Sequence, residues 1–185
     1  MKELGAAQFE HLDQLVKQNQ KLLGGDVVAM VWTDTLVYKT ELGEFDSKTV
    51  APIASSSKWL TAALILKMVD QGKISLDDKV SQYIPIYETY GKSYITIRHC
   101  LSHFTGIEAE KGIGGILSRK KFASLEDEVA SFAKKEIQSN PGTEFRYSNM
   151  GLNIAGRILE IVTKKKFDMP QRRAHPRTQR AQRDN

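Results

Sequence analysis

The sequence lacks the features that cross-link a chain or hold it in a membrane. Cys100 is the only cysteine among 185 residues, which excludes an internal disulfide. No apolar run reaches the roughly 18 residues that a membrane-spanning helix needs. Charged residues interrupt the first 23 positions, which therefore lack the apolar core of a signal peptide. We expect no membrane span, and the sequence assigns no cellular compartment.

The chain also lacks a basic folded face, although its net charge is +5. Residues 168–185 hold five Arg, two Asp and no Lys, whereas residues 1–167 hold 22 Lys and Arg against 20 Asp and Glu. A nearly neutral body argues against a nucleic-acid partner and leaves only an electrostatic contact by the Arg-rich tail as an alternative. With almost no apolar residues, the tail is expected to be either disordered or out of frame with the body.

Hydrophobic periodicity predicts a helix and a hairpin at the start of the chain. An amphipathic helix is expected over residues 6–23, a buried strand over 26–32 and an alternating partner strand over 36–42. A long stretch of helices and loops follows. This order predicts an α/β (α+β) domain over residues 1–167, with a helical lobe at about 73–163.

Turn and capping signals place the short helices of this lobe. Thr96 and Ser124 are expected as N-caps, and Ser75 or Asp77 as the cap of a helix that ends near Pro85. The helices expected with these caps, and the last helix of the lobe, cover residues 95–102, 124–138 and 150–163. Residues 103–120 are rich in glycine and are expected to form a flexible loop.

Residues 51–71 form the stretch around which we expect the domain to be organised. Three serines and Lys58 lead into a run that is apolar on every helical face. A helix that is apolar all round is usually buried, and Gly72 after it suits a left-handed C-cap. The serines should therefore lie at the buried N-terminus of a central helix, where free backbone N–H groups favour developing negative charge.

Ser55 and Lys58 are three residues apart and so share one helical face. A hydroxyl becomes a nucleophile when a base lies beside it, and burial favours the neutral form of a lysine that could act as that base. The alternative is that the serines cap a core helix and Lys58 extends its amine to solvent. The same spacing recurs at Ser118 and Ser131, so it is weakly specific on its own.

A second polar stretch places Tyr147 and Asn149 on either side of Ser148, between a turn and a helix. In an extended segment, residues i and i+2 point to the same side. A phenol can exchange a proton with a nearby hydroxyl, and an Asn side chain offers a donor and an acceptor to an amide or ester. Alternatively, Tyr147 is a packing residue and Ser148 or Asn149 is only a helix cap.

Taken together, these stretches resemble the serine β-lactamase and penicillin-binding-protein family, in particular class C β-lactamases and β-lactamase-like esterases. The matching stretches follow one another in consistent order, over residues 53–62, 72–80, 95–107 and 141–151. The resemblance implies a β-lactamase/transpeptidase-like fold, in which helices flank an antiparallel sheet.

The resemblance also implies roles for four residues. Ser55 would be the acylated nucleophile and Lys58 its proton acceptor. Tyr147 would relay the proton and activate the deacylating water, and Asn149 would contact the substrate carbonyl. The implied reaction is acyl transfer from a small-molecule substrate, namely a β-lactam, a D-Ala peptide or a small ester, without a metal or other cofactor.

The third motif of this family, Lys-Thr-Gly or His-x-Gly, does not occur in the sequence. The family's later strands, which supply one oxyanion N–H, would also follow residue 167. We therefore expect an N-terminal part that is truncated before the C-terminal strands, with little hydrolase activity and with an exposed core that favours self-association. The rival function is a catalytically inactive fragment or binding protein of the same fold.

One pattern suggests a metal site instead. His99 and His103 are spaced i, i+4 with Cys100 between them, as zinc ligands on a helix can be. No Glu follows His99, as the metalloprotease pattern would require. Metal binding is therefore an alternative and not the expected function.

Overall fold

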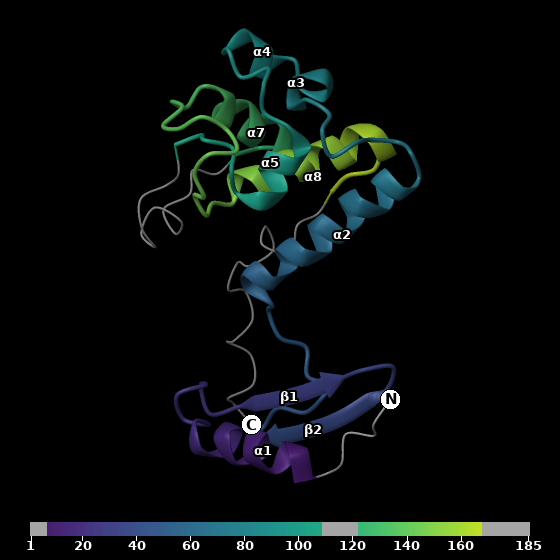
Figure 1. Ribbon diagram of the computed structural model, residues 1–185, viewed down its shortest axis with the longest axis vertical. Helices are drawn as coiled ribbons and strands as arrows, with labels where there is room; N and C mark the ends of the chain where they lie inside the picture. The colour runs from purple at the N-terminus through teal and green to yellow at the C-terminus, as the bar shows by residue number, and fades with distance from the viewer. Residues whose placement is uncertain (1–6, 109–121, 168–185) are drawn as a thin grey trace, which may run out of the picture. The chain divides into compact units, whose positions relative to one another are not determined.

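The computed structural model describes residues 7–108 and 122–167, which fall into two compact units divided between Pro52 and Ile53 (Figure 1). The first unit contains α1 (Ala7–Gln18), β1 (Val27–Trp32) and β2 (Leu36–Leu42). The second contains the short 3-10 helix η1 (Ala54–Ser56), α2 (Ser57–Asp70), α3 (Val80–Tyr83), α4 (Ile86–Thr89), α5 (Ile97–Ser102), α7 (Leu125–Ala133) and α8 (Met150–Thr163). Within these described ranges, no helix is long and apolar enough to cross a membrane.

The first unit is an antiparallel hairpin with a helix packed on it. The ring of Phe9 on α1 stacks on that of Tyr38 on β2, with centroids 5.2 Å apart. The Tyr38 hydroxyl donates a hydrogen bond of 3.2 Å to Asp13. The predicted hairpin is present, but α1 ends at Gln18, before the predicted end. After Gln18 the chain continues in turns, in which the Gln20 N–H donates a hydrogen bond of 3.3 Å to the Lys17 carbonyl.

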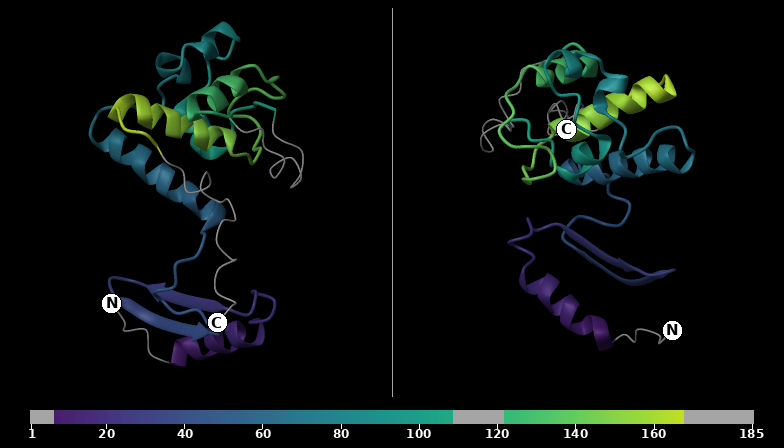
Figure 2. Two further views of the ribbon diagram at one scale, coloured as in Figure 1. Left: turned by 180° about the vertical axis from the view of Figure 1, so that it is seen from behind. Right: turned by 45° about the horizontal axis from the view of Figure 1, so that its top comes forward.

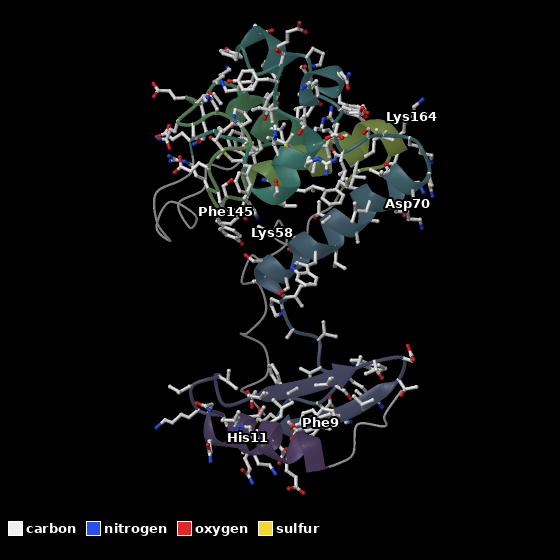
Figure 3. The ribbon with its side chains drawn as sticks, in the orientation of Figure 1. Phe9, His11, Lys58, Asp70, Phe145 and Lys164 are labelled. Carbon is white, nitrogen blue, oxygen red and sulfur yellow. The ribbon has the colours of Figure 1, made fainter. Side chains whose placement is uncertain are left out.

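The second unit is built around α8. Nine of its residues are buried, and it packs against α2, α5 and α7 (Figures 1 and 2). Asp70 and Lys164, at the C-terminal ends of α2 and α8, lie toward the same end of the unit in Figure 3, so these two helices run in the same direction. Because α8 is more deeply buried than α2, the prediction that α2 is the central helix is wrong for this unit, in which α8 has that position.

The buried face of α2 is narrow and partly polar. It consists of Ser57, Lys58, Thr61, Ile65 and Met68. The apolar side chains Trp59, Leu60, Leu64 and Leu66 are exposed. Because α2 is apolar on all sides, its sequence carries no periodicity that selects the buried face, and contact with α8 selects it instead. The self-association expected from an uncovered apolar face stays a prediction.

Two of the predicted N-caps are confirmed. The Thr96 hydroxyl accepts a hydrogen bond from the backbone N–H of His99 at 3.2 Å, and the Ser124 hydroxyl accepts one from that of Asp127 at 3.0 Å. Helix α7 nevertheless ends at Ala133 instead of reaching residue 138. The chain there becomes extended, since Ile137 pairs with Ile107 in an isolated β-bridge.

The predicted cap of α3 is wrong. Lys79 is its N-cap, and the Gln82 side chain accepts a hydrogen bond from the Lys79 backbone N–H at 3.1 Å. Ser75 and Asp77 instead belong to the preceding turn, in which the Asp77 N–H donates to the Ser75 hydroxyl and the Ser75 N–H donates to Asp78. The predicted glycine-rich loop lies partly, and the Arg-rich tail wholly, outside the described residues.

Glycine at position 151 allows α5 and α8 to approach closely. A methyl group at Gly151 would collide with the backbone carbonyl of Cys100, which is a rigid part of α5. Gly156, further along α8, faces the ring of Phe167. The missing side chain at Gly151 therefore fixes how near the first turn of α8 comes to α5.

We predict that Gly151→Ala lowers the free energy of unfolding by about 1–3 kcal/mol, because the added methyl group meets backbone that cannot move aside. An unhindered Gly→Ala change inside a helix instead stabilises by about 0.5–1 kcal/mol. Urea unfolding followed by far-ultraviolet circular dichroism measures the sign. Gly156→Ala is the matched control with a smaller expected loss, since the Phe167 side chain can rotate away. A stabilised Gly151→Ala variant would contradict the close approach.

Candidate active site

The candidate site begins where the chain enters α2. Ser55 lies in η1, and the residue before it, Ala54, has a positive φ of 43°, a conformation that residues other than glycine rarely adopt. Lys58 follows in the first turn of α2. Its Nζ donates a hydrogen bond of 3.1 Å to the Ser55 Oγ. Only 7% of Lys58 is exposed, whereas Ser55 is exposed at the surface.

The three consecutive serines differ in their surroundings. The hydroxyl of Ser57 donates a hydrogen bond of 2.7 Å to the backbone carbonyl of Ala54. Ser56 is exposed at the surface. Ser55 is the serine whose hydroxyl meets Lys58. The surface exposure of Ser55 and Ser56 differs from the predicted buried N-terminus, because only Ser57 and Lys58, the first residues of α2, are buried there.

Tyr147 brings a phenol to the same place from a distant part of the chain. Lys58 Nζ lies 5.0 Å from the centroid of its ring. Hydrogen bonding to Lys58, and secondly to Ser55, holds the pKa of the Tyr147 phenol below its ordinary value, and the positive charge of Lys58 adds to the effect. Serine, lysine and tyrosine side chains therefore meet at one point, as their predicted roles require.

These three side chains open into a groove of about 700 Å³ on the second unit. Its other lining residues are mostly apolar and come from η1, α2, α5 and α8 and from the segment just after α5: Ser56, Trp59, Ala62, Ala63, Leu66, Leu101, His103 and Leu152. In Figure 3, Lys58 lies at the end of α2 where that helix begins. An apolar groove beside a polar cluster can hold an organic acyl group next to the Ser55 hydroxyl.

Asn149, the fourth predicted site residue, is at the start of α8. It is the half-buried N-cap of α8, with helical backbone angles, and its carbonyl accepts the Asn153 N–H at 3.0 Å. It is absent from the set of described residues that line the groove. The expected alternation from Tyr147 fails because the chain has already turned into the helix at Asn149. Its role toward a substrate carbonyl stays a prediction.

His103 is a site residue whose position the sequence reasoning missed. It lines the groove, and its Nδ1 accepts a hydrogen bond from the Ser148 N–H at 3.4 Å. Burial, and secondly the charge of Lys58, lowers its pKa, which favours the neutral imidazole that this bond needs. The sequence carried no signal for this position, because a histidine just after a short helix could contact any of several segments.

The contacts of the two histidines differ from those of zinc ligands. The Nδ1 of His99 accepts the Thr96 N–H at 3.3 Å, that of His103 accepts from Ser148, and Cys100 between them is fully buried. Within residues 7–108 and 122–167, no group of three or more His, Cys, Asp or Glu side chains is placed to hold a metal ion.

A family model described as Beta-lactamase matches residues 12–169. The chain belongs to the beta-lactamase family. This match covers both units and includes Ser55, Lys58 and Tyr147. It agrees with the predicted family and with an α/β fold of the β-lactamase/transpeptidase type. The family is of the serine hydrolase type.

Individual relatives of this beta-lactamase family member share about a quarter to a third of the aligned residues. Protein flp of Staphylococcus aureus is 32% identical over 118 residues, which are 62% of this chain and 24% of that protein. A candidate beta-lactamase from Bacteroides dorei has a crystal structure with a TM-score of 0.74 and 27% identity, covering 89% of this chain and 49% of that one.

A further solved structure with a TM-score of 0.66 and 25% identity is EstCE1, described as a hydrolase with promiscuous acyltransferase activity. The match covers 88% of this chain and 48% of EstCE1. The chain thus spans about half the length of these solved structures, and the aligned part is about a quarter of protein flp.

We predict that Lys58→Met raises the pKa of Tyr147 toward the ordinary value of about 10, because the largest cause of its lowering is removed. Selective ¹³C labelling of the tyrosine Cζ atoms and an NMR pH titration measure it, with the Tyr147 signal assigned by its loss in Tyr147→Phe. Lys67→Met removes an exposed lysine from the same helix and is the control. A Tyr147 pKa that stays low without Lys58 would refute the contact.

Proposed function

We propose that this chain carries the nucleophile of a serine hydrolase that transfers an acyl group from an ester or amide through a Ser55 acyl-enzyme. The observation that carries the proposal is the hydrogen bond of 3.1 Å between Lys58 Nζ and Ser55 Oγ, with Tyr147 beside the same amine. A nucleophilic hydroxyl needs a proton acceptor within this distance. Membership of the beta-lactamase family supports the reaction class.

In the proposed step, the Ser55 oxygen attacks the substrate carbonyl carbon as its proton leaves for Lys58 and Tyr147. The close amine and phenol act as a coupled pair. The pair has no net charge in two states: a free amine beside a phenol, or an ammonium beside a phenolate. In each state it can accept one proton. The lowered pKa of Tyr147 favours the second of these states, because the phenol gives up its proton more readily. One proton therefore moves from serine to the pair without creating an isolated charge.

Release of the leaving group and of the acyl group reverses this proton transfer. The protonated pair donates to the departing oxygen or nitrogen, and the ester bond between Ser55 and the acyl group remains. The pair then takes a proton from water, whose oxygen attacks the same carbonyl, and returns a proton to Ser55. Tyr147, which is about half exposed, is the member of the pair that is open to this water.

The proposed substrate is a compound with an apolar acyl group: a β-lactam, a D-Ala peptide or a small ester. Two observations support this substrate class. The groove beside Ser55 has mainly apolar walls, and the related proteins of known structure include a candidate beta-lactamase and a hydrolase with acyltransferase activity.

A second function is a catalytically inactive or binding protein of the same fold. The 185 residues contain neither Lys-Thr-Gly nor His-x-Gly, the third motif that the family resemblance implies. Covalent labelling without turnover of a chromogenic ester would indicate a competent nucleophile in an incomplete site. Absence of both would favour the binding function.

We predict that a fluorophosphonate or penicillin-type probe labels Ser55 of the 185-residue chain, and that Ser55→Ala abolishes the labelling. Mass spectrometry of the digested adduct identifies the serine. Ser56→Ala is the matched control, because Ser56 lines the same groove and is exposed in the same way. An adduct on Ser56 or Ser57 would sink the assignment of the nucleophile.

We predict that Lys58→Met slows labelling by about 100- to 10,000-fold, the range typical of a lost general base, and that Tyr147→Phe slows it less because the amine remains beside Ser55. Time courses of probe incorporation give both rates, and Lys67→Met is again the control. Labelling of Lys58→Met at the rate of the unchanged chain would remove Lys58 from the reaction.

A further inference from the structure

His103 contacts the segment that carries Tyr147 through its backbone and through its side chain. Its carbonyl accepts the Arg146 N–H at 2.9 Å. Its Nδ1 accepts the Ser148 N–H at 3.4 Å. The two hydrogen bonds therefore hold the backbone on both sides of Tyr147.

The imidazole ring also lies against two aromatic rings of that segment. The ring centroid of His103 is 4.7 Å from that of Tyr147, in a tilted arrangement, and 5.7 Å from that of Phe145, edge to face. In Figure 3, Phe145 and Lys58 lie toward the same side of the unit. Distances of this size are those of ordinary aromatic contacts. The His103 ring thus contacts the Tyr147 ring, in addition to the two backbone hydrogen bonds on either side of that residue.

The backbone of His103 is suited to this role. Its φ of 64° places it in the left-handed region as the C-cap of α5. Glycine, asparagine, aspartate and histidine occur there more readily than other residues. Lys58 lies near enough for its charge to act on His103. A neutral imidazole with an acceptor at Nδ1 satisfies the Ser148 N–H without placing a second cation beside Lys58.

We propose that His103 is a positioning residue that holds the Tyr147 phenol against Lys58 and Ser55. That the held phenol relays a proton during acyl transfer rests on the proposed function. That His103 holds the phenol in place does not depend on any reaction. The alternative is that His103 only packs the loop after α5, in which case its removal changes stability but leaves the environment of the Tyr147 phenol as it is.

The variants His103→Gly and His103→Asn separate these roles. Glycine adopts the left-handed backbone freely and removes the whole side chain. Asparagine also tolerates this backbone and offers an acceptor oxygen to the Ser148 N–H. His99→Asn is the matched control, because His99 also accepts a backbone N–H through Nδ1, one helical turn earlier, from Thr96.

The first readout is the pKa of Tyr147 by NMR titration of its labelled Cζ atom. We expect His103→Gly to raise it toward the ordinary value and His103→Asn to restore most of the lowering, whereas His99→Asn leaves it unchanged. The rate of Ser55 labelling should fall by up to about 100-fold in His103→Gly, the scale of a small misplacement, and recover in His103→Asn. A Tyr147 pKa that is the same in all variants would overturn the proposal.

A second readout needs no variant and so does not depend on how well one folds. Hydrogen exchange of the Ser148 amide in the unchanged chain should be slower than that of exposed loop amides, because its N–H is bonded to His103. Rapid exchange there would also overturn the proposal. If these readouts respond as expected and Ser55 never labels, the proposed function fails and the positioning stands. If Ser55 labels and the Tyr147 pKa does not respond, the positioning fails and the proposed function stands.

Discussion

The contact between Gly151 and the Cys100 carbonyl fixes the position of α8, and much of the second unit depends on it. The first turn of α8 lies against the backbone of α5, which leaves no space for a side chain there. The segment that carries Tyr147 leads directly into this turn, so its position follows from the same contact. Because α8 also packs on α2, one buried helix relates the Ser55–Lys58 pair to the phenol that completes the cluster.

The parts of the fold that could be predicted from the sequence are those that local chemistry decides. Strand β2 and helix α8 have the predicted bounds, and Thr96 and Ser124 cap their helices as expected. The pairing of Ser55 with Lys58 belongs to the same class, because residues three apart on a helix are neighbours whatever surrounds them. The family resemblance added Tyr147, which no local rule could have brought to Lys58.

The parts that could not be predicted depend on contacts between distant segments. The buried face of α2 was not readable, since every face is apolar and α8 selects one. The end of α7 depends on the bridge between Ile137 and Ile107. Asn149 follows the helical geometry of its own N-cap position. The contacts of His103 needed the fold, because a histidine after a short helix points to no particular partner in the sequence.

The separation of Ser55 and Tyr147 along the chain has a consequence for the order in which the site forms during folding. Ser55 and Lys58 come together with a single helical turn, which forms quickly and from local contacts. Tyr147 joins them only when a long loop has closed, and such closure is the slower, entropically costly event. A chain in which this loop is open has the serine and the amine close in sequence but lacks the phenol. Under the proposed function, the serine therefore has its full set of partners only in the folded unit.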